Sequence, residues 1–497
     1  METKVNLSKQ WFIDSRKGNI KDSYHFIERL GSGGFGVVYL AQERKSGDKF
    51  AVKAIQKNKI QDYDTFQNEI RTLRTLDHPN IIKLYEIWEW QDVCFLVTEQ
   101  LLLNVNAIVS FCEGGELFYY ILQKKSLSEK EAALIMKQGF SALSYIHHNK
   151  ISHRDIKPEN FMLKNKDDIT NIKLIDFGLA KDFSEQQAMQ TPSGSPYYIA
   201  PEVFSSKYNE KCDLWSIGVV LYILLSGKVP FPGESNKEII ENVVKGDYHF
   251  NHEAFLSVSA LAKDLIKKLL VKDIDQRYSA VEAYNHPWIQ KSEEILDNEI
   301  AAEAFDNMKN FMQAVNLKKT TLIYLASKLP EKNIDELRKL FIQIDLDGDG
   351  IITSEEFKHA LTIYGFQIDK DEIEQLVNQI DTNNNGFIDY TEFIAGCMKS
   401  KIYLREENIR GAFQYFDQDQ SGSITKDELK SILSSEDVMI PDAYIEQIIK
   451  EVDVNKDDQI DYNEFLEMMK KDLKVRLAVY NMNLKDLMIF KPQCSIF

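Results

Sequence analysis

The sequence predicts an α+β protein, in which a two-lobed domain of strands followed by helices precedes an all-α module of two lobes. Three observations support this. Apolar residues after Tyr24 cluster in short strand-like runs, such as Val37 to Tyr39 and Phe50 to Val52. After about Ser126 the apolar periods become longer and helical. Residues 331–470 form a repeat, because similar acidic loops begin at 345, 381, 417 and 453, each 36 residues after the last.

These patterns predict five segments. Residues 1–23 form a polar N-terminal extension, 24–289 the two-lobed domain, 290–330 an amphipathic and basic junction, 331–470 the repeat module and 471–497 a tail. The most apolar stretch, Trp215 to Leu225, is too short for a membrane span, so we expect a buried helix. The five cysteines lack zinc-like spacing and indicate reduced thiols of an intracellular protein: Cys94, Cys112, Cys212, Cys397 and Cys494.

The charge of the chain is concentrated in the repeat module. The whole chain has a formal net charge of −17, and residues 331–470 alone carry −18. A module this acidic favours divalent cations as partners and argues against nucleic acid. The N-terminus lacks the apolar core of a signal peptide, and Glu2 stands where N-myristoylation requires glycine. We therefore expect a cytoplasmic protein.

A glycine-rich segment opens the two-lobed domain. Residues 31–38 read Gly-Ser-Gly-Gly-Phe-Gly-Val-Val and fit the pattern G-x-G-x-x-G-x-V. The glycines Gly31, Gly33 and Gly36 let backbone amides approach a phosphate, because no Cβ intrudes. Such turns are common, but here Lys53 follows on the next strand signal, where its ammonium can bind the α- and β-phosphates of a nucleotide. Glu69, on a helical pattern, can pair with Lys53, although single charges of this kind are usually solvated.

Three further motifs follow in order: His153-Arg154-Asp155-Ile156-Lys157-Pro158-Glu159-Asn160, Asp176-Phe177-Gly178 and Ala200-Pro201-Glu202. Asp155 can accept the proton of an attacking hydroxyl, and Lys157 can neutralise a γ-phosphate. Asn160 and Asp176 offer hard oxygen ligands for magnesium. Glu202 has a plausible buried partner in Arg277.

With these motifs, residues 24–289 resemble an active eukaryotic protein kinase. The resemblance implies an ATP site and magnesium, with these ATP-site residues: Leu30, Gly31, Gly33, Gly36, Val38, Ala51, Lys53, Glu69, Glu116 and Asp176. Lys157 and Ser195 resemble serine/threonine kinases. Glu116 and Glu159 match positions at which such kinases bind an arginine of the substrate, so we expect protein substrates phosphorylated near basic residues; the alternative is that both are ordinary surface acids.

The four repeats fit EF-hand calcium loops at 345–356, 381–392, 417–428 and 453–464. We expect their isoleucines at position 8 to pair the loops by short β-bridges, two loops per lobe. Ser421 is a weaker, neutral ligand, and Asp458 replaces the usual glycine, at a cost of about 1 kcal/mol for a left-handed backbone. The expected calcium ligands are Asp345, Asp347, Asp349, Ile351, Glu356, Asp381, Asn383, Asn385, Phe387, Glu392, Asp417, Asp419, Ser421, Ser423, Glu428, Asp453, Asn455, Asp457, Gln459 and Glu464.

A kinase followed by four EF-hands resembles the calcium-dependent protein kinases of plants and protists. That resemblance implies that the junction keeps the kinase inactive until calcium binds, and that the EF-hand domain then binds the junction. The junction carries an apolar stripe with lysines beside it: Met308, Phe311, Met312, Val315, Leu322, Ile323 and Leu325, with Lys309, Lys318 and Lys319. The alternatives are a passive linker helix and, for the whole chain, a catalytically weak calcium-responsive scaffold.

Two features depart from this pattern. Residues 100–110 are inserted where a kinase has the short hinge that binds adenine, so the adenine contacts stay unassigned. The insertion is apolar, without glycine or proline, and reads either as a translated intron or as a tolerated loop. The C-terminal residues Cys494 to Phe497 fit the prenylation pattern C-a-a-X, which would attach the chain to a membrane; the alternative is a chance cysteine.

Overall fold

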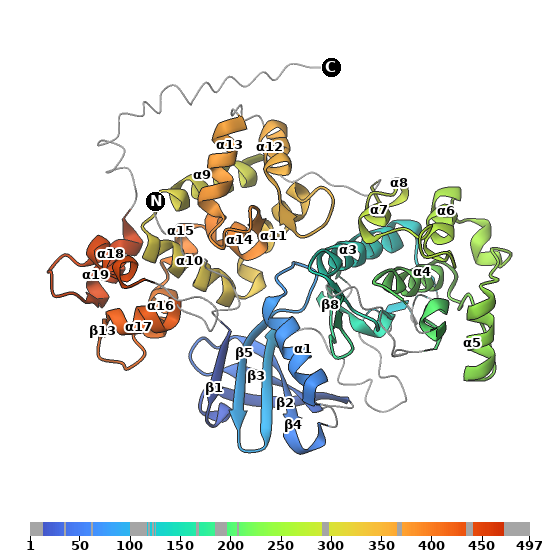
Figure 1. Cartoon of the computed structure of the whole chain (residues 1–497), viewed down its shortest axis with the longest axis horizontal. Coiled ribbons are helices and arrows are strands. Elements are labelled where there is room, and N and C mark those ends of the chain that lie inside the picture. The colour runs from blue at the N-terminus through green and yellow to red at the C-terminus, as the bar shows by residue number, and fades with distance from the viewer. Residues whose placement is uncertain are drawn as a thin grey trace. The chain divides into compact units, whose positions relative to one another are not determined.

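The computed structural model describes residues 13–471, with gaps at 34–35, 61–62, 100–116, 118–119, 122–123, 125, 166–167, 184–195, 206–207, 291–297, 365–369 and 434–440. It separates into two compact units. Figure 1 labels the helices and strands and colours them by residue number. The larger consists of residues 4–302 and 326–394, and the smaller of residues 1–3, 303–325 and 395–497. In the described part of the chain, no helix combines the length and apolar character needed to cross a membrane.

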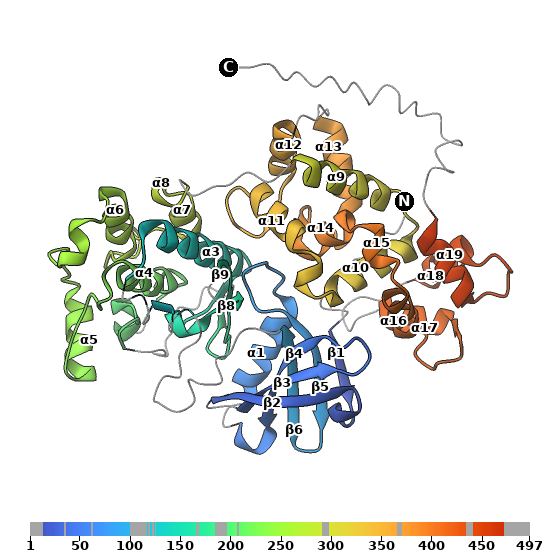
Figure 2. The ribbon, with the colours of Figure 1, turned by 180° about the vertical axis from the view of Figure 1, so that it is seen from behind.

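A six-stranded sheet begins the larger unit, with the strand order β1-β5-β6-β4-β3-β2 and helix α1 (Tyr63–Thr75) beside it (Figure 2). The strands are β1 (Asp14–Lys17), β2 (Tyr24–Gly33), β3 (Gly36–Glu43), β4 (Lys49–Gln56), β5 (Leu84–Trp90) and β6 (Val93–Glu99). β1 pairs parallel with β5, whereas the other neighbours are antiparallel. Strand β1 lies within residues 1–23, which the sequence predicts to be a polar extension. A strand of four residues is too short to show an apolar period.

A helical lobe follows in the same unit. Its helices are α3 (Glu129–His148), α4 (Lys211–Ser226), α5 (Asn236–Lys245), α6 (Ala260–Leu269), α7 (Ala280–Tyr284) and α8 (Pro287–Gln290). Two short strand pairs accompany them: β7 (Ile151–Ser152) with β10 (Lys181–Asp182), and β8 (Phe161–Asn165) with β9 (Asp168–Leu174).

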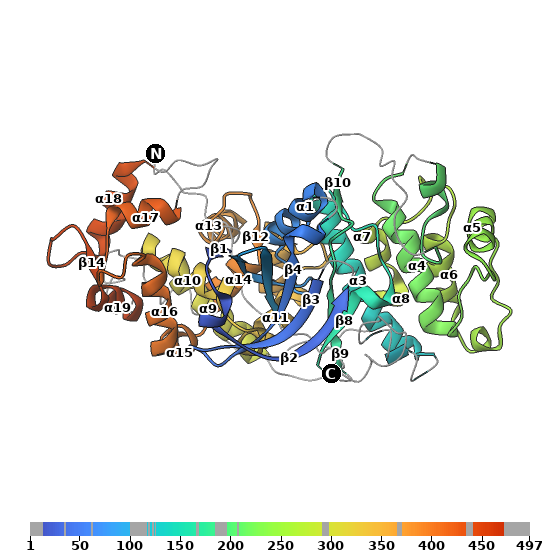
Figure 3. The ribbon, with the colours of Figure 1, turned by 90° about the horizontal axis from the view of Figure 1, so that it is seen from below.

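Helix α4 is the predicted apolar helix, and it is buried along nearly its whole length. Trp215 is fully buried and stacks on Phe231 with ring centroids 5.5 Å apart. Gly218 allows α4 to approach α6 closely (Figure 3), because a Cβ there would lie 2.8 Å from the Cβ of Leu269. The expectation of a core helix is confirmed.

The repeat module folds into helix–loop–helix motifs, some of which lie in the larger unit and some in the smaller. The larger unit holds α11 (Asp335–Ile344), β11 (Ile351–Ile352), α12 (Ser354–Ile363), α13 (Lys370–Ile380), β12 (Ile388–Asp389) and most of α14 (Tyr390–Cys397). The smaller holds most of α9 (Asn298–Met312) and α10 (Asn316–Lys328), then α15 (Ser400–Tyr403), α16 (Glu406–Phe416), β13 (Ser423–Ile424), α17 (Lys426–Leu433), α18 (Asp442–Val452), β14 (Ile460–Asp461) and α19 (Tyr462–Lys470).

Candidate functional site

The sheet aligns the glycine-rich strand with the predicted phosphate-binding lysine. Val38 of β3 lies opposite Gly31 of β2 on one side and opposite Lys53 of β4 on the other. Among the described residues, and apart from the chain neighbours of Gly31, no atom lies within 4 Å of the place where a Cβ on Gly31 would stand, so the space beside this backbone is open to a ligand. Gly36 has another reason to be glycine, because a Cβ there would collide with the carbonyl oxygen of Ala54. Leu30 and Ala51 are buried.

Lys53 and Glu69 form the ion pair that the sequence predicts. The Nζ atom of Lys53 lies 3.0 Å from Oε1 of Glu69, which α1 carries and which is 6% exposed. Burial works to lower the pKa of Lys53, but the charges of Glu69 and Asp176 outweigh it and the pKa is raised. The ammonium therefore stays charged and is held near Asp176, as a phosphate-binding group requires.

The residues of the predicted catalytic loop gather around one carboxylate. Lys157 Nζ lies 2.7 Å from Oδ2 of Asp155, and the Asn160 side-chain amide donates to the same oxygen at 3.1 Å and to the Asp155 carbonyl at 2.7 Å. Asp155 is 9% exposed. A carboxylate held in this way can accept a proton from a hydroxyl placed beside it.

A buried aspartate on α4 holds the backbone of this loop. Asp213 is fully buried and accepts hydrogen bonds from the amides of His153 (2.9 Å) and Arg154 (2.8 Å). It also accepts from the Ser152 hydroxyl at 3.0 Å, and His147 Nε2 lies 2.9 Å away. The sequence reasoning missed this residue, although a single acid inside an apolar helical run is a usable signal, since buried carboxylates need partners.

Asp176 has a left-handed backbone conformation, with a φ of 63°. Residues other than glycine rarely adopt this conformation, and those that do are often found at functional sites. Its Oδ1 accepts from the amide of Gly178 at 3.3 Å. The next residue, Phe177, packs edge-on against His153 with centroids 4.9 Å apart, which links this segment to the catalytic loop. The carboxylate of Asp176 and the amide oxygen of Asn160 are hard ligands that fit Mg²⁺.

Two further predictions concern the glutamates Glu202 and Glu159. Glu202 and Arg277 form the expected pair through both carboxylate oxygens, with Nη2 2.9 Å from Oε2, so this prediction is confirmed. In the described part of the chain, Oε2 of Glu159 is buried without a hydrogen-bond partner, and burial raises the pKa of this residue. A buried acceptor of this kind can receive a cationic donor from a ligand.

The first loop in the larger unit brings three acidic side chains together. One carboxylate oxygen from each of Asp345, Asp347 and Asp349 lies within 4.8 Å of the others. Burial, followed by the charge of Asp347, raises the pKa of Asp349 to about 7. Burial and the charge of Asp389 likewise raise the pKa of Glu392. Crowded, desolvated carboxylates fit a divalent cation, which would remove their mutual repulsion.

The smaller unit repeats this arrangement with Asp417, Asp419 and Glu428. Asp458 has a φ of 61°, as predicted for the residue that replaces glycine. The expected β-bridges are also confirmed: Ile352 pairs with Ile388, and Ile424 with Ile460. Each loop has a glutamate at position 12 that accepts a hydrogen bond from a backbone amide of the same loop: Glu356, Glu392, Glu428 and Glu464.

Within the predicted junction the structure describes two separate helices, α9 and α10. The predicted apolar stripe is therefore divided between them. In the smaller unit, Asn307 Nδ2 donates to the Cys397 carbonyl at 3.1 Å and Lys318 Nζ to the Met469 carbonyl at 2.8 Å. Tyr324 stacks on Tyr415 with centroids 4.2 Å apart. Most of the predicted apolar stripe is buried: Met308, Phe311, Leu322, Ile323 and Leu325.

In the larger unit, a buried charge cluster joins the end of β6 to the residues before α11. Glu99 lies 2.7 Å from Lys164 and 3.5 Å from Lys173, and Lys173 also lies 3.0 Å from Glu331. Burial works to raise the pKa of Glu99, but the charges of Lys164 and Lys173 lower it overall. Near this cluster, Asp77 accepts from the Thr391 amide at 2.8 Å. These contacts pair residues up to 314 positions apart, so no local pattern predicts them.

Several predicted residues lie outside the described residues: Glu116, Ser195, the insertion 100–110, Cys112 and Cys494. The remaining predicted site residues are described. Cys94, Cys212 and Cys397 are buried free thiols.

Comparison with known proteins gives matches along most of the chain. Residues 24–289 match the model of the protein kinase domain, and residues 334–398 and 406–470 each match the EF-hand domain pair. The chain is 40% identical to calcium-dependent protein kinase 3 of Plasmodium berghei (strain Anka), over 93% of this chain and 83% of that protein. It is 40% identical to calcium-dependent protein kinase SK5 of Glycine max, over 94% and 90%. Calcium-dependent protein kinase 33 of Arabidopsis thaliana is 38% identical, over 91% and 85%.

Proposed function

The chain belongs to the calcium-dependent protein kinase family and is a calcium-regulated serine/threonine kinase that uses ATP, Mg²⁺ and Ca²⁺, and from this premise we propose the roles of its residues. Nothing in these findings favours the alternative of a catalytically weak scaffold.

The observation that carries the assignment is the cluster of Lys157 and Asn160 around Asp155, with Lys53 charged and paired to Glu69. Asp155 accepts the proton of the attacking hydroxyl, and Lys157 neutralises charge on the γ-phosphate. Lys53 binds the α- and β-phosphates beneath the backbone of Gly31, Gly33 and Gly36. Asn160 and Asp176 would hold Mg²⁺, and the bound ion would supply positive charge to offset that of the transferring phosphoryl group. Asp213 keeps the loop in position through the amides of His153 and Arg154.

A preference for substrates with an arginine near the phosphorylated residue is part of the proposal. The buried Oε2 of Glu159, which has no hydrogen-bond partner among the described residues, supports it, because a guanidinium would supply the missing donor. Glu116 is the second carboxylate proposed for this role. Replacing that arginine with alanine in a peptide substrate should raise the KM for the peptide, and the increase should be smaller in the variant Glu159→Gln.

Regulation is proposed to act through the junction at 290–330. Without calcium this segment keeps the kinase inactive, and calcium bound by the loops makes the EF-hand domain bind it instead. The burial of Met308 and Phe311 and the contacts of Lys318 and Tyr324 in the smaller unit support the second half of this scheme.

The whole assignment is tested by transfer of radiolabelled phosphate from ATP to a protein substrate, with calcium and with a chelator. Transfer to serine or threonine that rises with calcium supports it. Nucleotide binding without transfer under any calcium concentration would favour the scaffold.

The cellular location is proposed to be the cytoplasm, with reversible membrane attachment through a prenylated Cys494. Phe497 at the last position favours a geranylgeranyl group, and one lipid gives only weak attachment. The intact mass of the protein from its native cell tests this, because an unmodified chain ending at Phe497 would exclude it.

A further inference from the structure

We propose that residues 13–18, which precede the matched kinase domain, position helix α1 and thereby the pair of Lys53 and Glu69. The inference rests on the proposed function, since it assigns Ile13 and Arg16 as positioning residues for the phosphoryl transfer described above. In this proposal they act through α1 and not by direct contact with the nucleotide.

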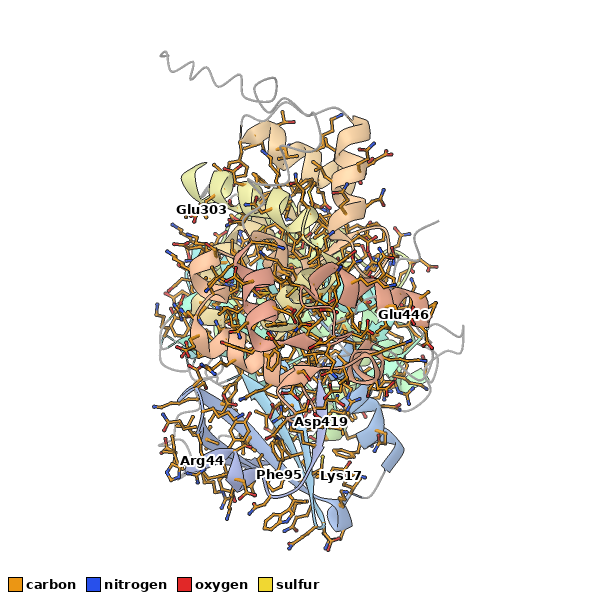
Figure 4. The ribbon with its side chains drawn as sticks, turned by 90° about the vertical axis from the view of Figure 1, so that its left-hand side faces the viewer. Lys17, Arg44, Phe95, Glu303, Asp419 and Glu446 are labelled. Carbon is orange, nitrogen blue, oxygen red and sulfur yellow. The ribbon has the colours of Figure 1, made fainter. Side chains whose placement is uncertain are left out.

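The segment is an ordered part of the sheet. β1 runs parallel to β5 with Ser15 opposite Ile87 and Arg16 opposite Trp88, and the Gly18 amide donates to the Glu89 carbonyl at 3.0 Å. Figure 4 labels Lys17 at the end of this strand. The strand therefore extends the sheet by one member beyond β5 and is fixed in register there.

A buried charge holds this strand in place. Arg16 Nη2 lies 3.0 Å from Oε1 of Glu86, which is 7% exposed, and the Arg16 guanidinium lies over the Trp88 ring at 5.4 Å. The other oxygen of Glu86 accepts from the hydroxyl of Tyr24 at 3.0 Å and from the Trp88 indole at 2.9 Å. A buried carboxylate is costly without compensation, so Glu86 and Arg16 stabilise each other.

The same strand fastens the end of α1. Arg74, in the last turn of α1, donates to the hydroxyl of Ser15. Ile13 is 6% exposed and belongs to the apolar cluster that contains Phe66 and Leu73 of α1 and Ile87 of β5. The hydrogen bond thus joins β1 to the last turn of α1, and Ile13, just before the strand, is buried in the same large apolar cluster as Phe66 and Leu73.

Glu69 lies five residues before Arg74 on this helix, which is about 7–8 Å along the axis. The 3.0 Å separation of Lys53 and Glu69 persists only while α1 keeps its distance from β4. Loosening the C-terminal end of α1 should therefore weaken that pair, and Lys53 would then bind the phosphates of ATP less well. The residues proposed to bind the peptide, Glu116 and Glu159, belong to neither β1 nor α1, so peptide binding should not change.

The test uses the full chain at saturating calcium, with the variants Arg16→Gln and Ile13→Val. The matched control is Lys17→Gln, on the same strand, whose side chain is exposed. For the first two we expect KM for ATP to rise about three- to tenfold while KM for the peptide changes less than about twofold. We also expect faster hydrogen exchange at the amides of α1 and unchanged exchange in α4. The control should match the wild type in every measurement.

Folded variants with unchanged KM for ATP and unchanged exchange in α1 would overturn the proposal. Equal losses for ATP and peptide, with exchange raised throughout the molecule, would also overturn it, because they indicate a merely structural strand. If even the wild type transferred no phosphate, the proposed function would fail, but exchange in α1 would still decide whether β1 positions this helix.

Discussion

At the scale of single residues, the proposed chemistry depends on charges held in fixed places. Two sets of contacts position Asp155. Lys157 and Asn160 contact its carboxylate, and Asp213 holds the preceding backbone by accepting hydrogen bonds from the neighbouring amides. The first calcium loop differs, since the carboxylates of Asp345, Asp347 and Asp349 crowd together, and burial followed by the charge of Asp347 raises the pKa of Asp349 to about 7.

Replacing Asp155 with asparagine should abolish most of the turnover. The variant Asp155→Asn retains the size of the side chain and removes the proton acceptor, so we expect kcat to fall by about 10²–10⁴-fold while ATP still binds. Single-turnover phosphate transfer and nucleotide binding measure the two effects. Asp247→Asn, at an exposed aspartate of the helical lobe, is the control. Near-normal turnover in Asp155→Asn would contradict the assigned role.

Removing the carboxylate at position 12 of a loop should raise the calcium requirement. For Glu356→Gln and Glu392→Gln we expect the calcium concentration for half-maximal activity to increase on the order of tenfold, since each loses a bidentate ligand. A calcium titration of kinase activity measures this. Glu355→Gln, at the exposed neighbouring position, should titrate like the wild type, and an unchanged midpoint in the first two variants would refute the assignment.

At the scale of elements, buried ion pairs join segments that are distant in the sequence. Arg277 is 1% exposed, binds both oxygens of Glu202, and donates to the carbonyls of Val271 (2.9 Å) and Lys211 (2.9 Å). This one side chain connects the short helix that begins at Pro201, the start of α4 and the segment after α6.

Breaking this pair should destabilise the helical lobe. Glu202→Gln leaves the Arg277 charge buried without its counter-charge, which typically costs about 3–5 kcal/mol. We expect a lower melting temperature in thermal unfolding of the full chain. The exposed carboxylate of Glu241 provides the control, because Glu241→Gln should melt with the wild type. A melting temperature of Glu202→Gln equal to that of the control would show that the pair contributes little.

The insertion at 100–110 also belongs to this scale. The sequence on either side joins directly into a kinase hinge, so deletion of residues 100–110 should leave a folded chain that binds ATP. Nucleotide titration and thermal unfolding of the deleted chain check this, and loss of folding would contradict it. Sequencing the messenger RNA tests the translated-intron hypothesis separately, since dominant transcripts that retain those 33 nucleotides would refute it.

At the scale of the whole molecule, calcium sensing and phosphoryl transfer lie in one chain. Two sets of contacts connect the kinase domain to the first EF-hand pair within the larger unit. One is the charge cluster of Glu99, Lys173 and Glu331, and the other is the hydrogen bond between Asp77 and Thr391. The same unit therefore contains both the proposed catalytic residues and two of the four EF-hand loops.

Chelation of calcium should bring the activity close to baseline, and added calcium should restore it. A chain that ends at residue 289 lacks all four loops, so any activity that it retains should not respond to calcium. Activity assays at fixed substrate with chelator and with calcium compare the two chains. Full activity of the complete chain in chelator, or an unchanged calcium response after truncation, would contradict calcium regulation through the EF-hands.

The sequence by itself determined the features that depend on local spacing. The proposed calcium ligands recur within 12 residues, the β-bridges follow from position 8 of each loop, and the kinase motifs are contiguous runs in a diagnostic order. The left-handed backbone of Asp458 was also predictable, because the loop geometry requires it at that position. These features are encoded by neighbouring residues, so no knowledge of the fold was needed to place them.

Only the tertiary structure decided which distant residues meet. Asp213 lies about 60 residues from the amides that it holds, and Glu331 lies 158 residues from Lys173. Strand β1 is too short for a periodic signal, and its partner β5 follows about 70 residues later. Such contacts form because a buried charge needs a counter-charge and the edge of a sheet needs a partner. The folded chain supplies both from segments far apart in the sequence, which no local sequence pattern can predict.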